Sequence, residues 1–120
     1  NGAREFHHMM LNVSPKAMGL CLETHWIYRG CGGSNHAVLD VMKLYGERIN
    51  TTHLRQSQNR IWDETFRDGD VDHREIFRRL RKLDYSGPLT LEMAIEEGTP
   101  NTMSHSEAHR RAKKYLTEIL

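Results

Sequence analysis

The chain has 120 residues, of which 38% are hydrophobic and 28% charged, and its formal net charge is +1. This length allows at most one domain, and a charge so close to balance gives no reason to expect nucleic acid or an anionic membrane surface as a partner. No apolar stretch approaches the ~20 residues of a membrane-spanning helix. The two cysteines, Cys21 and Cys31, lack a C-x-x-C spacing, which favours a reducing, cytoplasmic location over a disulfide framework.

The first half of the chain alternates helical and extended patterns. Residues 4–11 predict the end of a helix, and residues 18–24 predict a strand. A glycine-rich loop over residues 30–35 leads into a predicted helix over residues 36–45, whose apolar side chains recur at helical spacing. Gly46 directly follows this helix and is a candidate C-cap.

The same order of elements continues after residue 47. A second strand is predicted over residues 48–54, and a long polar loop follows over residues 55–71. Asp72 and Glu75 have the spacing of a capping box, which predicts the start of a helix. The apolar side chains of that helix share one face: Ile76, Phe77, Leu80 and Leu83. Its opposite face is rich in arginine, a pattern typical of a solvated helix surface.

The third strand and the last helix complete the pattern. A strand is predicted over residues 89–94 after a turn at residues 86–88. Ser104 and Glu107 form a second capping-box pattern and open the final helix. Because single helices separate the strands, the chain belongs to the α/β class, with a parallel sheet and right-handed crossovers.

Each predicted strand ends in a side chain that can bind a metal: Glu23, His53 and Glu92. Successive members of this trio are separated by about one β/α repeat of a barrel, and the C-terminal ends of parallel strands meet on one side of the sheet. Two carboxylates and an imidazole suit Mn, Mg, Co or Zn. The sequence therefore predicts a divalent metal site at the C-terminal ends of the strands.

Alternation along the strands assigns a face to each residue. Cys21, Thr51 and Thr90 share the parity of the candidate ligands, and they are small or polar, as expected inside a barrel near its catalytic mouth. Residues of opposite parity are mostly apolar, as expected for a face that packs on helices: Leu20, Leu22, Thr52, Leu54, Leu89, Leu91 and Met93.

Three strands cannot close a barrel, and an open parallel sheet of this size leaves two edges and one face uncovered. We therefore expect residues 1–120 to form the C-terminal part of a single TIM-barrel domain, namely the last three strands of a (β/α)8 barrel that is incomplete on its own. The remaining strands would come from missing sequence or from another chain, and a homo-oligomer is one such arrangement.

Four segments together resemble the xylose isomerase-like TIM barrels, the sugar phosphate isomerase/epimerase superfamily. Residues 19–30 are similar to the sixth strand and its loop, and residues 48–55 are similar to the seventh strand, which usually ends in a His-Leu-Lys-Asp type of motif. Residues 68–72 resemble the Gly-x-Gly-Asp-Val-Asp loop before the seventh helix. Residues 85–92 are similar to the eighth strand, with its Gly-Tyr-x-Gly lead-in and its terminal Glu.

The resemblance implies roles for the strand-end residues. His53 and Glu92 would be metal ligands, and Glu23 would stand where the family usually has Asp. The family's fourth ligand, a Glu on an earlier strand, has no counterpart in this chain. The family often shows Asp-x-x-His on the sixth strand, whereas here the histidine, His25, lies only two residues after Glu23. His25 would either replace the family's substrate-contacting histidine or ligate the metal itself.

Further residues are candidates for substrate binding. Trp26 and Trp62 are candidates to stack on a sugar, and packing in the core is the equal alternative for both. Arg29 and Arg60 are loop cations that can hold a sugar hydroxyl or a phosphate. Arg55 stands where the family has the Lys of its seventh-strand motif, so its contacts to substrate would differ from those of the family.

The reaction implied by the resemblance is proton transfer next to a carbonyl, as in the isomerisation or epimerisation of a small-molecule sugar. A divalent metal would polarise the carbonyl and hydroxyl oxygens and stabilise an enediolate. Glu92 is the candidate for both metal ligand and catalytic base, and its partner base would lie outside this chain.

Two other functions compete with this one. A metal nuclease that resembles apurinic endonuclease IV would need more ligands, including an Asp-x-His in the seventh loop that is absent here, and the weak net charge also argues against it. The last alternative is a catalytically inert partial barrel, because the chain lacks at least one ligand and one acid/base group. Whether the chain is an enzyme therefore depends on whether its barrel is complete.

Overall fold

Three short parallel strands form the centre of the structure, in the order β1-β2-β5. The computed structural model describes residues 2–120. The sheet consists of β1 (Leu20–Glu23), β2 (Ile49–Leu54) and β5 (Leu89–Leu91), and a small hairpin follows β2, made of β3 (Ser57–Gln58) and β4 (Ile61–Trp62). The helices are α1 (Gly2–Asn12), α2 (Thr24–Gly30), α3 (Asn35–Tyr45), α4 (His73–Lys82) and α5 (His105–Ile119), with a 3-10 turn η1 at Gly46–Arg48. The α/β class and the parallel sheet are thus as the sequence predicts.

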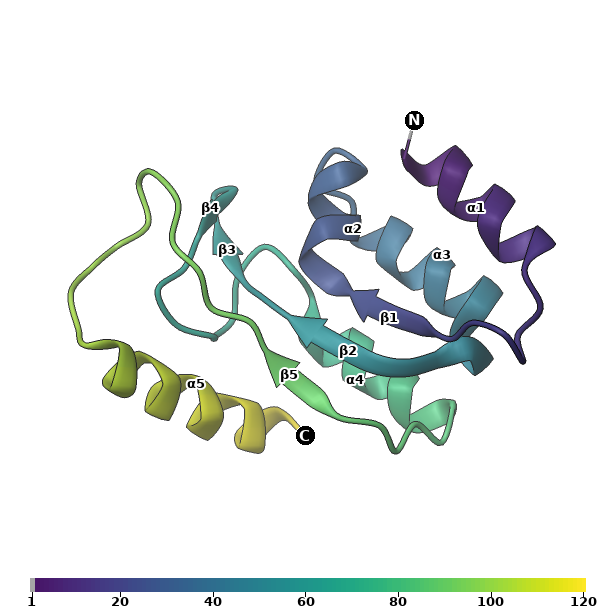
Figure 1. Cartoon of the computed structure of the whole chain (residues 1–120). Coiled ribbons are helices and arrows are strands. Elements are labelled where there is room, and N and C mark those ends of the chain that lie inside the picture. Colours follow the sequence, from purple (N-terminus) through teal and green to yellow (C-terminus); the bar gives the residue numbers. More distant parts are fainter. Residues whose placement is uncertain (1) are drawn as a thin grey trace.

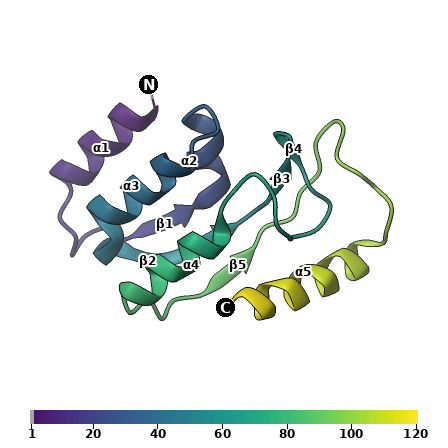
Figure 2. The same cartoon turned by 180° about the vertical axis from the view of Figure 1, so that it is seen from behind.

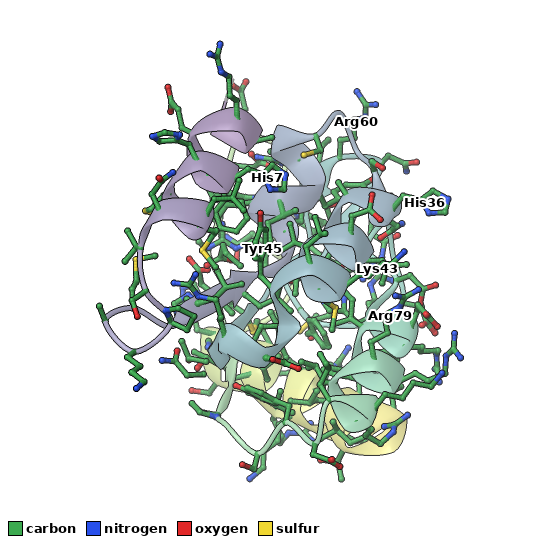
Figure 3. The ribbon with its side chains drawn as sticks, turned by 90° about the vertical axis from the view of Figure 1, so that its right-hand side faces the viewer. His7, His36, Lys43, Tyr45, Arg60 and Arg79 are labelled. Carbon is green, nitrogen blue, oxygen red and sulfur yellow. The ribbon has the colours of Figure 1, made fainter. Side chains whose placement is uncertain are left out.

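The helices α3 and α4 lie on one face of the sheet. Figure 1 looks onto the other face, and Figure 2 shows α3 and α4 in front of the strands when the molecule is seen from behind. The helix α1 packs against α3, where His7 Nδ1 lies 2.8 Å from the hydroxyl of Tyr45, and Figure 3 shows these two side chains together. Among the described residues, no helix is long and apolar enough to cross a membrane.

The two faces of the sheet differ as the alternation of the sequence predicts. Leu22 and Leu54 are fully buried and belong to the core that the strands share with α3, α4 and α5. On the opposite face, which we call the bare face, Cys21, Asn50 and Thr90 are exposed. A parallel sheet is normally covered on both faces, so this half-covered sheet is unusual and has its polar side turned to solvent.

An irregularity in the pairing of β1 with β2 determines which residues reach the bare face. Leu20 pairs with Ile49, but the next residue, Cys21, pairs with Thr51. Asn50 is therefore an extra residue in β2, in the manner of a β-bulge, which re-aims the side chains that follow it. Ile49 is buried although it has the same parity as Thr51, and the irregularity explains how the two can face opposite sides.

Three sequence-based expectations are wrong in detail. The strand expected to include Thr24 ends at Glu23, and α2 begins immediately after it, because His25 and Tyr28 bury their rings when this segment is helical. The loop expected over residues 55–71 contains the β3-β4 hairpin. The third strand ends at Leu91 rather than at residue 94.

Gly46 does not end α3 in the left-handed conformation of a usual C-cap glycine. Its φ of −56° is helical, and the chain continues from it into η1. A Cβ at this position would lie 2.6 Å from Leu83 Cδ1. Glycine is therefore needed here for the close approach of the loop after α4 rather than for its backbone freedom.

Each of the two capping boxes forms on one side only. Asp72 accepts a hydrogen bond from the backbone N–H of Glu75 at 3.0 Å, and Ser104 accepts one from Glu107 at 3.3 Å. The glutamate carboxylates do not bond back to the caps but pair with arginines one turn later in their helices: Arg78 and Arg79 for Glu75, Arg110 and Arg111 for Glu107. The helix starts at 73 and 105 are as the capping patterns predict.

The Asp-Gly-Asp loop, residues 68–72, packs tightly against the chain that leaves β2. Gln56 is buried, and its side-chain amide donates to Val71 O at 2.9 Å and accepts from the N–H groups of Ser57 and Val71. Asp70 accepts from Ser57 Oγ at 2.7 Å. Gly69 sits between these contacts, and a Cβ there would lie 2.5 Å from the backbone oxygen of Ser57.

We therefore expect Gly69→Ala to lower the free energy of unfolding by about 1–3 kcal/mol, because the backbone of a packed loop must shift to admit the methyl group. Denaturant unfolding monitored by circular dichroism measures this change. Gly30→Ala is the matched control, since a Cβ at Gly30 meets no atom within 4 Å. Equal stability of the two variants would show that the loop is not packed as described.

Candidate metal centre

The three strand ends bring Glu23, His53 and Glu92 together on the bare face. Glu23 and His53 are directly paired in the parallel register of β1 and β2. Glu92 follows β5 by one residue, and its backbone N–H donates to Leu54 O at 2.9 Å, which extends the pairing to the third strand end. His53 Nδ1 lies 2.9 Å from Glu23 Oε2 and 3.7 Å from Glu92 Oε2.

Cys21 joins this group from one step deeper in β1. Because successive side chains in a strand alternate between faces, Cys21 and Glu23 point to the same side. Single ligand atoms of Cys21, Glu23 and His53 all lie within 4.8 Å of one another. The sequence placed Cys21 on the face of the candidate ligands but did not identify it as a ligand.

The electrostatics of the group favour a cation. Burial, and after it the negative charge of Glu92, raise the pKa of Glu23 above its usual value. Partial burial and the charges of Glu23 and Glu92 also raise the pKa of the Cys21 thiol, although the residue as a whole is exposed. Glu23 Oε1 and Glu92 Oε2 are buried and have no hydrogen-bond partner. A divalent metal would satisfy both orphaned oxygens and offset the repulsion between the carboxylates, so these residues fit such an ion.

The buried side chain of Arg55 holds the Glu92 carboxylate in place. Its side chain is only 5% exposed, and its Nη2 donates a hydrogen bond to Glu92 Oε1. The guanidinium lies 3.9 Å from the centre of the Trp62 ring, a cation–π distance. One oxygen of Glu92 is therefore held in place, while the other remains without a partner.

Two tryptophans stand beside the group. Trp26 and Trp62 pack edge to face with ring centres 5.7 Å apart, and Trp26 is 48% exposed. Arg29 lies 5.1 Å from the Trp62 ring and donates to both oxygens of Glu96, at 2.6 and 2.9 Å. This pairing lowers the pKa of Glu96 to about 2. Glu96 also accepts from the backbone N–H of Trp62 at 2.8 Å, so it fixes the arrangement of α2, β4 and the loop after β5.

His25 does not join the strand-end trio within the described residues. It lies in α2, fully buried, with its ring 6.3 Å from that of Trp62. Neither ring nitrogen has a hydrogen-bond partner, and burial, with the nearby charges of Arg29 and Arg55, lowers the pKa of His25 to about 4. The parity that would align it with Glu23 does not apply, because the strand ends at Glu23.

Arg60 is placed by the hairpin rather than by the trio. It lies in the turn between β3 and β4 with a φ of 70°, and its backbone N–H donates to Asp70 Oδ2 at 2.7 Å. Its guanidinium donates to Gly32 O at 3.2 Å, and Figure 3 shows Arg60 near one end of the molecule. The structure therefore brings Trp26, Arg29 and Arg55 close to one another. Arg29 also donates to Arg60 O at 2.7 Å, but the Arg60 guanidinium lies against the glycine-rich loop.

Some site residues escaped the sequence analysis for clear reasons. Cys21 carried a signal, the strand alternation, because it precedes Glu23 by two residues. No sequence pattern pointed to Glu96, because it lies in an irregular loop, where the spacing of residues does not indicate which way a side chain points.

His73 is buried at the start of α4, with Nε2 3.2 Å from Thr24 Oγ1 and Nδ1 3.3 Å from Gln56 Nε2, and it supports the strand ends from the helix side.

One hollow of the molecule lies away from the strand ends. It is formed by the loop after β5 and α5, and its lining includes Met93, Ile95, Met103 and His105. None of the three strand-end residues lines it. The candidate metal centre thus opens onto the bare face instead of a closed pocket.

The model of the protein family described as xylose isomerase-like TIM barrel matches residues 2–118. No curated protein matches the chain significantly. The match covers the segments on which the resemblance rests, including all three strand ends.

Proposed function

The chain belongs to the xylose isomerase-like TIM barrel family, and on that premise we propose that it is part of a metal-dependent sugar isomerase or epimerase. The family includes sugar isomerases and epimerases as well as endonuclease IV-like members. The observation that carries the proposal is the convergence of Glu23, His53 and Glu92, with two buried carboxylate oxygens that have no partner.

We also propose that residues 1–120 form the last three strands of a barrel whose other strands come from further sequence or from another chain. The bare face supports this proposal. It carries polar and small residues at the positions that line a barrel interior, and its metal-binding residues lie at the C-terminal strand ends, where barrel enzymes have their active sites.

Glu23, His53 and Glu92 would hold the metal. When bound, it would polarise the oxygens of the sugar's carbonyl and neighbouring hydroxyl. Arg55 orients the Glu92 carboxylate by binding Oε1, and this carboxylate would take a proton from the carbon next to the carbonyl and return it. Trp26, half-exposed beside this group, would stack on the apolar face of the sugar ring and exclude water from it.

Solvent exchange tests the reaction directly. The protein in its complete assembly, incubated with a panel of aldoses and ketoses in D2O and a divalent metal, should incorporate deuterium next to the carbonyl. Glu92→Gln should slow this exchange about 10²–10⁴-fold, the usual contribution of a general base. Glu97→Gln, an exposed carboxylate in the following loop, is the control and should keep the wild-type rate.

The two alternatives make different predictions in the same samples. A nuclease would cleave DNA with abasic sites and would bind DNA with an affinity that falls steeply with salt. An inert partial barrel would show neither exchange nor cleavage and would contain no metal. Deuterium incorporation that is unchanged in Glu92→Gln would remove Glu92 from the reaction.

A further inference from the structure

The thiol of Cys21 lies beside the strand-end trio, and neither the family motif nor the proposed reaction uses it. We propose that Cys21 binds the metal directly as a thiolate, together with Glu23 and His53, so that this chain selects zinc or cobalt over magnesium or manganese. This inference rests on the metal site of the proposed function and adds a ligand to it.

The backbone brings Cys21 to the group by two features. Cys21 and Glu23 are two residues apart in β1 and so face the same side. The irregularity at Asn50 pairs Cys21 with Thr51 and Glu23 with His53, so that the ligand atoms of Cys21, Glu23 and His53 lie within 4.8 Å of one another. Small rotamer changes would bring these atoms to the separations found around a bound zinc ion.

The chemistry of the donors indicates the class of metal. Magnesium and manganese prefer carboxylate, carbonyl and water oxygens. A thiolate is a soft ligand that favours zinc, and it also favours cobalt, which serves as a spectroscopic substitute for zinc. With Glu92, the protein donors are one sulfur, one nitrogen and two carboxylate oxygens. Zinc binds all three donor types and can expand to five-coordinate, which keeps a position for water or substrate.

Cys21 is also accessible to a metal that enters from the bare face. It is exposed, and its neighbours on that face, Asn50 and Thr90, are exposed as well. The second cysteine, Cys31, lies after α2, where its backbone caps the helix, and it does not belong to the metal-binding group. The chain therefore contains its own control for a thiolate effect.

Titration of the reduced chain with cobalt(II) tests the inference without an activity assay. A thiolate ligand gives an intense charge-transfer absorption in the near ultraviolet, whereas carboxylate and imidazole ligands do not. We expect this band in the wild type and in Cys31→Ser, and we expect it to be absent in Cys21→Ser. His53→Ala should weaken the band, because it removes a neighbouring ligand of the same ion.

Competition experiments test the selectivity. Substitution of a residue that merely hydrogen-bonds to a metal ligand costs about 10–100-fold in metal affinity. Loss of the thiolate, a direct ligand, should therefore weaken zinc binding by at least about tenfold. Magnesium binding should be unchanged in Cys21→Ser. Circular dichroism of each variant shows that the fold is retained, and the conservative exchange of an exposed thiol for a hydroxyl makes this the expected result.

The outcomes separate the inference from the function on which it rests. Cobalt that binds in a His53-dependent way without the band, or a band that persists in Cys21→Ser, overturns the role of Cys21 and leaves the metal site standing. If the wild type shows no cobalt binding that depends on Glu23 and His53, both the role of Cys21 and the metal site of the proposed function are overturned.

Discussion

Replacing His53 by alanine should lower the affinity of the chain for a divalent metal by about 100-fold or more, since even residues that merely support a ligand contribute about 10–100-fold. His53 occupies the middle strand end, with Glu23 at 2.9 Å on one side and Glu92 at 3.7 Å on the other. Without the imidazole, the two carboxylates would share an ion across the gap that it leaves. Isothermal titration calorimetry and metal analysis of the purified protein measure the change.

A matched control is available in His36, an exposed histidine at the start of α3, whose side chain points outward in Figure 3. His36→Ala should keep the wild-type metal content. Glu92→Gln should lower it as His53→Ala does, because the amide removes the charge but keeps the shape. If neither His53→Ala nor Glu92→Gln lowers the metal content, the trio is not the metal site.

Lowering the pH from 7 to 5 should destabilise the fold by about 2 kcal/mol through His73 alone. This histidine is 3% exposed, and burial, with a smaller contribution from His25, lowers its pKa to about 3. An unfolded histidine has a pKa near 6.5. The folded state therefore binds fewer protons than the unfolded state between pH 6.5 and 3, and the stability present above pH 6.5 is lost as the pH falls through this window.

Denaturant unfolding at a series of pH values measures the effect. In His73→Gln the loss between pH 7 and 5 should shrink by most of this amount, because glutamine can keep a hydrogen bond to Thr24 or Gln56 but does not titrate. The comparison is made within each variant, so a constant change in stability caused by the substitution cancels. A loss of the same size in both proteins would assign the acid sensitivity to other groups.

The sequence predicts well those features that depend on periodicity. The alternation of Leu20, Leu22 and Leu54 with polar residues gave the two faces of the sheet correctly, because burial follows a period of two in a strand. The capping patterns at Asp72 and Ser104 gave two helix starts correctly, because the hydrogen bond of a cap is local. The second strand ends at Leu54 as predicted, and the family match confirms the resemblance that the strand-end motifs carry.

Features that depend on tertiary contacts could not be predicted in this way. The helix α2 has seven residues and no side-chain cap, which is too short for a stable helix on its own, and the burial of His25 and Tyr28 determines its form. The β3-β4 hairpin arises because Asp70, from a later loop, binds the backbone of Asn59 and Arg60. No periodic pattern in residues 55–71 indicates a bond between residues that are 10 or 11 positions apart.

The extra residue Asn50 is what allows Ile49 and His53 to lie on opposite faces of the sheet, although strict alternation over four positions would put them on the same face. Deletion of Asn50 would leave Ile49 and Thr51 as alternating neighbours, so Ile49 would stay in the core, His53 would stay on the bare face, and the pairing with β1 would become regular. An insertion between Ile49 and His53 would instead add a second unpaired residue opposite β1. A scan of single insertions and deletions in β2 should therefore find deletion of Asn50 better tolerated than an insertion beside it.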